Sequence, residues 1–116
     1  MSKQSSPASE RGDLLRGALE MLILRTLDRA PMHGFGITEA IRDASEEILT
    51  IDEGSMYPAL YRMQARGWIA AEWGRSENNR RAKFYSLTPE GRRHLADAAE
   101  RWSQFSRAVG RVMDPA

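Results

Sequence analysis

The sequence predicts a mainly α-helical fold with a small β-hairpin, an α+β arrangement. Three segments before residue 67 and one after residue 88 repeat apolar residues at helical spacing. Between them, residues 68–73 and 83–87 are short, rich in aromatic residues and roughly alternating in polarity, which is typical of two paired strands. With 116 residues, 41% of them hydrophobic, the chain is long enough for one domain with a modest core.

The first helix is expected to follow a tail. Residues 1–12 hold almost no side chain suited to burial, so we expect them to be disordered. Asp13 is a candidate N-cap for a helix over 14–29, and the proline and glycine of 30–34 end it. Because its apolar residues cover more than one face, this helix is expected to pack against the core and a further element or subunit.

Two shorter helices follow. One is predicted over 35–45, and its candidate buried residues are Phe35, Ile37, Ala40 and Ile41. The next begins after the possible N-caps of 52–55 and ends near Arg66, with Gly67 as its C′ residue. On this third helix Met56, Leu60 and Met63 recur at core spacing.

The hairpin and the last helix complete the chain. Residues 74–82 form a long polar tip between the two strands. Thr88 can cap a helix that starts at Pro89 and runs towards Met113, since proline suits the first helical position. We therefore expect a tail over 1–12, a compact unit over 13–88 and a C-terminal helix within 89–116.

This order of elements is that of a winged helix-turn-helix domain with an added C-terminal helix. In that fold the third helix enters the DNA major groove, while the hairpin, or wing, reaches phosphates or the minor groove. Hydroxyl, guanidinium and ring groups on the outward face of the third helix suit phosphate and base contacts. The candidates are Ser55, Tyr57, Pro58, Tyr61 and Arg62. The alternative is an ordinary solvated helix face.

The hairpin tip strengthens the DNA-binding interpretation. The formal net charge of the chain is only +1, so affinity for nucleic acid must come from a local patch. Residues 75–83 carry Arg75, Arg80, Arg81 and Lys83 against the single acid Glu77. Such a patch suits phosphate neutralisation. The alternative is that these residues only keep a β-turn soluble.

The last helix predicts a homodimer. Its apolar residues follow the spacing of a helix packed along another helix, and they are Leu95, Ala98, Trp102, Phe105, Val109 and Val112. The simplest partner is the same helix of a second subunit, which makes it a dimerisation helix. The alternative is packing within the chain against 14–27. A gap between paired helices would let Trp102 and Phe105 stack a planar ligand.

Other functions lack the residues they need. The chain has no cysteine, which excludes disulfides, thiol catalysis and cysteine-bound metals. Neither His33 nor His94 has a patterned nucleophile or metal-ligand partner, so we expect no enzyme, no metal and no cofactor. The longest apolar runs fall well short of a membrane span, and the N-terminus lacks a secretory signal. We expect a cytoplasmic protein with no membrane partner.

Four segments carry a family resemblance. They are His33 to Ile37, Glu53 to Met63, Gly67 to Ile69, and Arg80 to Gly91 with its Arg-Arg-Ala-Lys-Phe-Tyr-Ser-Leu-Thr run. The chain resembles the PadR family of bacterial transcriptional regulators, in its compact subfamily with a single C-terminal helix. The resemblance implies a dimeric repressor that binds an inverted-repeat operator. It implies DNA contacts at Ser55, Tyr57, Pro58 and Arg62, wing contacts at Arg80, Arg81 and Lys83, and an aromatic effector at Trp102.

Together these observations predict a homodimer that represses transcription by binding double-stranded promoter DNA, with release by an aromatic small molecule as a further hypothesis. The rival prediction is a winged-helix dimer that binds proteins or small molecules but not DNA. Replacing Arg80 and Arg81 by alanine separates the two, because only DNA binding would weaken and lose salt dependence.

Overall fold

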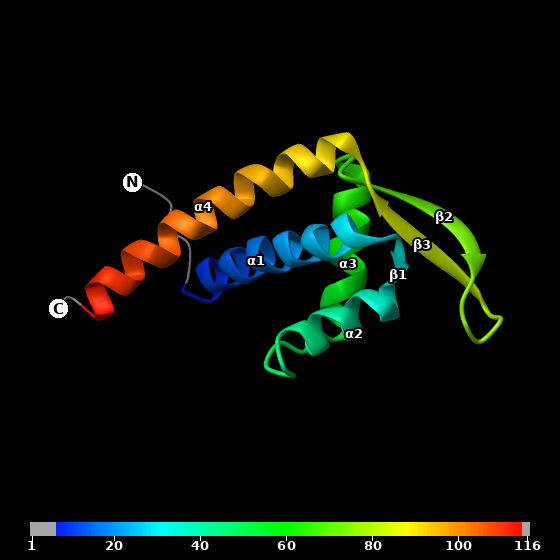
Figure 1. The fold of residues 1–116 in the computed structure, drawn as a ribbon, viewed down its shortest axis with the longest axis horizontal. Coiled ribbons are helices and arrows are strands. Elements are labelled where there is room, and N and C mark those ends of the chain that lie inside the picture. The colour runs from blue at the N-terminus through cyan, green and yellow to red at the C-terminus, as the bar shows by residue number, and fades with distance from the viewer. Residues whose placement is uncertain (1–6, 115–116) are drawn as a thin grey trace.

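The structure is a computed structural model that describes residues 7–114, with side chains from Arg16 onward. Its elements are α1 (Pro7–Arg29), β1 (Met32–His33), α2 (Gly34–Ala44), α3 (Glu53–Ala65), β2 (Ile69–Arg75), β3 (Arg81–Leu87) and α4 (Pro89–Met113) (Figure 1). The strands form one antiparallel sheet in the order β1-β3-β2. This architecture confirms the predicted α+β winged helix-turn-helix fold with a C-terminal helix.

Helix α1 starts earlier than the sequence predicted. It begins at Pro7, so residues 7–12 are helical and Asp13 lies inside the helix rather than at its N-cap. Proline is preorganised for the first helical position, and lengthening an anchored helix needs no new nucleus. The expected tail over 1–12 is therefore wrong for residues 7–12, while residues 1–6 lie outside the described part of the chain.

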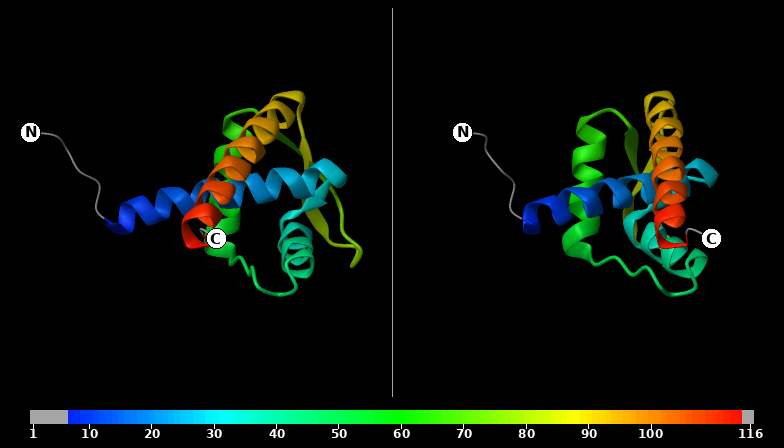
Figure 2. Two further views of the ribbon diagram at one scale, coloured as in Figure 1. Left: turned by 60° about the vertical axis from the view of Figure 1, so that its left-hand side comes forward. Right: turned by 90° about the vertical axis from the view of Figure 1, so that its left-hand side faces the viewer.

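Helix α1 is the centre of the fold. Ile23, Leu24 and Leu27 are buried, and the helix contacts α2, α3, β3 and α4. Figure 2 shows α4 crossing α1 while α2 and α3 lie on its other sides. The prediction that this helix needs more than one partner surface is confirmed, and a single chain supplies these surfaces.

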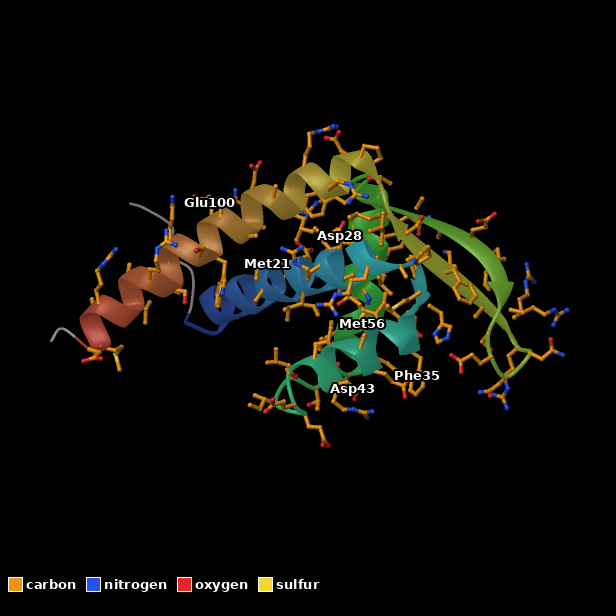
Figure 3. All side chains as sticks on the ribbon, in the orientation of Figure 1. Met21, Asp28, Phe35, Asp43, Met56 and Glu100 are labelled. Carbon is orange, nitrogen blue, oxygen red and sulfur yellow. The ribbon has the colours of Figure 1, made fainter. Side chains whose placement is uncertain are left out.

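Helix α2 departs from its prediction at Phe35. His33 caps the helix by accepting a hydrogen bond on Nδ1 from the Gly36 N–H at 3.0 Å. This cap turns Gly34, Ile37 and Ile41 towards the core, because residues three and four apart share one helix face. Phe35 lies off that face and is 62% exposed, so its expected burial is wrong (Figure 3).

Helix α3 agrees with the sequence analysis. The Asp52 carboxylate caps it by accepting from the Ser55 N–H at 2.8 Å, and Gly67 follows its end with a φ of 78°. Met56, Leu60 and Met63 are fully buried against the other helices, as predicted. The opposite face of α3 is thereby left to solvent.

The sheet is larger than the predicted hairpin. Strands β2 and β3 pair from Ile69↔Leu87 to Arg75↔Arg81, which shortens the tip to residues 76–80. The short strand β1 adds to the other edge of β3, with Met32 opposite Tyr85. Strand β1 was not predicted, because two residues are too few to show a period.

Helix α4 begins inside the domain and then leaves it. The Thr88 hydroxyl accepts from the Gly91 N–H and shares its proton between the Gly67 and Trp68 carbonyls in the segment from α3 to β2, which fixes the start of the helix. Leu95 is 4% exposed and belongs to the core of the single chain, so its assignment to a dimer interface is corrected. Beyond it the helix first runs beside α1, where Ala98 and Trp102 line a hollow with α1 residues, and its C-terminal end then projects past α1 (Figure 1). The radius of gyration is accordingly 16.1 Å, against about 13 Å for a compact domain of this length.

No described helix is both long and apolar enough to cross a bilayer.

Candidate nucleic-acid interface

One face of the wing is cationic. Cross-strand partners share a face of a sheet, and faces alternate along each strand. The face that buries Ile69 and Tyr85 at the base of the sheet therefore continues, towards the tip, as Trp73, Arg75, Arg81 and Lys83. Alternation thus collects three of the four predicted wing cations on one surface, and Arg80 lies in the tip beside them.

The wing is internally ordered. The guanidinium of Arg81 lies over the ring of Trp73, 4.4 Å from its centroid, which restricts the arginine while leaving it exposed. The tip is closed by the Ser76 N–H donating to the Arg80 carbonyl at 2.8 Å. Arg75 Nη1 donates to the Asn79 carbonyl at 3.3 Å. The cations are therefore held on a folded scaffold rather than on a loose loop.

The outward face of α3 carries four of the five predicted side chains. Ser55 and Pro58 are exposed, Tyr57 is 46% exposed and Tyr61 is 77% exposed. These hydroxyl and ring groups lie on the side of α3 opposite Met56, Leu60 and Met63. They are free to meet a ligand that approaches this helix.

Arg62 is turned the other way. Its Nε donates to the Glu20 carboxylate at 3.3 Å, and Arg66 Nη1 lies 3.8 Å from the second oxygen of the same group. Glu20 is only 6% exposed, and a buried carboxylate requires a cationic partner. The expected outward orientation of Arg62 is therefore wrong, because the acid on α1 holds its guanidinium against the domain.

A groove of about 880 Å³ separates the wing from the start of α2. Its walls include Phe35 and Tyr57 from the helices and Trp73, Arg81 and Lys83 from the wing. The ring of Tyr57 lies so close to Gly34 that a Cβ there would be 2.8 Å from the Tyr57 hydroxyl oxygen. Wing cations and Tyr57, one residue of the exposed face of α3, thus line one hollow surface.

Sequence reasoning missed Trp73, Tyr85 and His33 as members of this surface. Trp73 could have been found, because it alternates with Arg75 on one face of the strand. Tyr85 and His33 could not, since their place depends on the pairing of β1 with β3. His33 packs its ring edge against Phe84 at 5.3 Å between centroids and so joins α2 to the wing.

A second hollow lies between α1 and α4. It measures about 260 Å³ and is lined by Trp102, Phe105 and small or flexible residues of α1 such as Ala18 and Met21. The two aromatic rings are 6.0 Å apart. Trp102, Phe105 and Val109 remain about half exposed, and the apolar residues at the end of α4, Val112 and Met113, are 77% exposed. Ala98 lines the same hollow and is only partly exposed.

In the part of the chain with described side chains, no three His, Asp or Glu residues lie close enough together to hold a metal ion.

Known proteins are similar to this chain in sequence and in fold. Residues 23–97 match the PadR-like family of transcriptional regulators. Transcriptional regulator Rv3488 of Mycobacterium tuberculosis is 28% identical over 94 residues, which cover 81% of this chain and 84% of that protein. A transcriptional regulator from Clostridium thermocellum superposes with a TM-score of 0.77 at 28% identity, over 85% of this chain and 96% of that one.

A PadR family regulator from Eggerthella lenta gives a TM-score of 0.74 at 28% identity and covers 94% of this chain and 93% of its own. The match at residues 23–97 spans well over half of the chain and includes α2, α3 and the wing. It also includes the surface on which exposed α3 side chains adjoin the wing cations. The chain therefore belongs to the PadR-like family of transcriptional regulators.

Proposed function

We propose that this protein is a homodimeric repressor that binds an inverted-repeat operator in promoter DNA. The observation that carries the proposal is the alignment of Trp73, Arg75, Arg81 and Lys83 on one wing face, which shares a groove with Tyr57 of α3. In winged helix-turn-helix domains the third helix reads the major groove and the wing contacts the flanking backbone. The mechanism is steric and electrostatic, without catalysis, and operates in the cytoplasm.

The division of roles follows from chemistry. Hydroxyls of Ser55, Tyr57 and Tyr61 bond phosphate or base edges, and the ring of Pro58 packs on a thymine methyl. The wing cations Arg75, Arg80, Arg81 and Lys83 neutralise phosphates and make the affinity salt-dependent. Arg62 has an indirect role, because its bond to Glu20 fixes α3 against α1.

Dimerisation is proposed through the second half of α4. Trp102, Phe105, Val109 and Val112 are between 42% and 77% exposed, on a helix that projects from the body of the fold. An apolar ridge of this kind is stabilised by burial against a second copy. Two-fold symmetry would place the two α3 helices in successive major grooves, about 34–36 Å apart.

The same seam offers a place for an effector. The hollow of about 260 Å³ at Trp102 and Phe105 is mainly apolar and adjoins the proposed interface. A planar aromatic molecule stacked there would alter the packing of α4 and hence the spacing of the two α3 helices. Trp102→Ala is expected to abolish effector-dependent release while sparing operator binding, and unchanged release would refute this role.

The function is tested by fluorescence anisotropy. The protein is titrated into the duplex upstream of its own coding region and into an unrelated duplex, each at two salt concentrations. A specific regulator is expected to prefer its own promoter by at least ~10³-fold, with binding that weakens as salt rises. Absence of binding to either duplex would refute DNA binding and favour a winged-helix dimer that binds proteins or small molecules.

A further inference from the structure

Tyr85 has a buried ring and an unused hydroxyl. The residue is only 6% exposed and belongs to the hydrophobic core, yet it also lines the groove between the wing and α2. No side chain or backbone group in the described part of the chain hydrogen-bonds to its hydroxyl, although no fully buried side-chain polar atom there lacks a partner. The Tyr85 oxygen is therefore not fully buried, and the hollow that Tyr85 lines is this groove, which makes the hydroxyl a candidate to meet a ligand there.

Tyr57 lines the same groove as Tyr85, and its hydroxyl lies beside the first residue of α2. The Tyr57 ring covers Gly34, the first residue of α2, and this contact is possible only because glycine has no Cβ. Tyr57 lies close enough to Tyr85 to affect the ionisation of Tyr85. Burial and then the neighbouring Tyr57 raise the pKa of Tyr85, so its hydroxyl keeps its proton and can donate a hydrogen bond.

The start of α2 completes the set of donors. Met32 pairs with Tyr85, and Gly34 follows two residues later, so strand pairing brings the first turn of α2 beside both tyrosines. The Gly36 N–H is used by His33, but the N–H groups of Gly34 and Phe35 have no partner within the helix. The first turn of this 11-residue helix holds no acidic residue, and its dipole favours an anion.

The groove is lined by cations of the wing strands and by two acids. Lys83 lies two residues from Tyr85 on the same face of β3, and Arg81 follows towards the tip. The acids of the groove, Glu39 and Glu77, lie one turn into α2 and in the wing tip. The donors at the head of α2 are thus flanked by cations on the side where the wing adjoins α3.

We propose that this corner is a built site for a single phosphate of the DNA backbone, bonded by the hydroxyls of Tyr57 and Tyr85 and by the free N–H groups that open α2. The inference rests on the proposed function, because it is a phosphate of the bound duplex that occupies the site. A phosphate bound there would hold α2, the first helix of the helix-turn-helix pair, and the base of the wing against the same DNA strand. This sets the depth at which α3 enters the groove.

The test removes one hydroxyl. Tyr85→Phe is expected to weaken binding roughly tenfold on both the operator and an unrelated duplex, because a hydrogen bond to a charged phosphate is lost. The melting temperature of the protein is expected to stay unchanged, since this hydroxyl bonds nothing within the described chain. A lowered melting temperature with unchanged affinity would overturn the proposal and assign the hydroxyl a structural role.

A phosphate scan locates the partner. Each phosphate of the operator is replaced in turn by a neutral methylphosphonate, and the affinities of the wild type and Tyr85→Phe are compared. At one position in each half of the inverted repeat, the substitution is expected to weaken the wild type but to add no further loss to Tyr85→Phe. The matched control is Tyr61→Phe, which removes a hydroxyl from the exposed face of α3 and is expected to add its loss at that same position.

Failure of the site and failure of the function give different results. Wild-type binding that Tyr85→Phe leaves unchanged, or losses that add at every phosphate, would overturn the phosphate site and leave DNA binding intact. A wild type that binds no duplex would overturn the proposed function. Titration with inorganic phosphate at constant ionic strength is run beside these assays. Tight binding that Tyr85→Phe abolishes would assign the corner to a free anion instead.

Discussion

The salt dependence of DNA binding should report the cationic face of the wing. The perturbation is the double substitution Arg81→Ala and Lys83→Ala. Both side chains lie on the wing face that adjoins α3, and neither forms an ion pair with a described acid. They are therefore available to displace counterions from phosphates, and their removal should leave the fold intact.

The magnitude follows from counting contacts. Each phosphate neutralised on duplex DNA contributes about 0.9 to the slope of log affinity against log salt, so losing two contacts per wing reduces the slope by about 1.8. Between 50 and 200 mM salt the wild type should then lose roughly 12-fold more affinity than the variant. If both wings of the proposed dimer contact the duplex, the change in slope doubles to about 3.6.

The assay is anisotropy across four or more salt concentrations on the operator duplex. The matched control removes two charges from Arg92 and Arg93, which are exposed at the start of α4 and paired with Asp28 and Glu90. In Figure 1 this end of α4 lies away from the wing tip. Equal slopes for the wild type and the wing variant would refute the assignment of this face to DNA, whereas a reduced slope in the control would show a general charge effect.

Three further predictions concern the rest of the molecule. Gly91→Ala should lower the free energy of unfolding, measured by chemical denaturation, by more than ~2 kcal/mol, because a Cβ would overlap the Trp68 carbonyl. Gly110 has open space around it, so Gly110→Ala should raise the free energy of unfolding by up to ~1 kcal/mol. Phe105→Asp should convert the proposed dimer to a monomer in analytical ultracentrifugation with little change in melting temperature, and a dimer that persists would contradict the proposed α4 interface. Burial lowers the pKa of His94, which stacks on Trp68 at 3.7 Å. Protonation therefore disfavours the folded state, so the melting temperature should hold above about pH 6.5 and fall below it, and His94→Phe should flatten that fall.

Local signals in the sequence were enough for most of the fold. The spacing of Met56, Leu60 and Met63 identified the buried face of α3, and Thr88 with Pro89 identified the start of α4. Gly67 marked the end of α3 through its positive φ. These features depend on neighbours within a turn or two of the chain, so composition and period determine them without knowledge of the rest of the protein.

The candidate site was predicted in part for the same reason. The cations between Arg75 and Lys83 were visible as a local excess of charge, and Ser55, Pro58 and Tyr61 followed from the helical period. Arg62 was assigned to the outward face because the sequence cannot show that Glu20, on another helix, would bind it. The period of α3 places Arg62 near the boundary between its faces, and the buried acid decides which way the guanidinium turns.

The sequence by itself therefore determined the order of the helices and the hairpin, the core of α3, the starts of α3 and α4 and the basic wing. The tertiary structure alone decided that Phe35 is exposed, that β1 joins the sheet and that Leu95 fills the core of the single chain. It also brought Tyr57, Tyr85 and the first turn of α2 to one corner. Periodicity and capping act over a few residues, whereas these outcomes depend on which surfaces, distant in sequence, exclude water together.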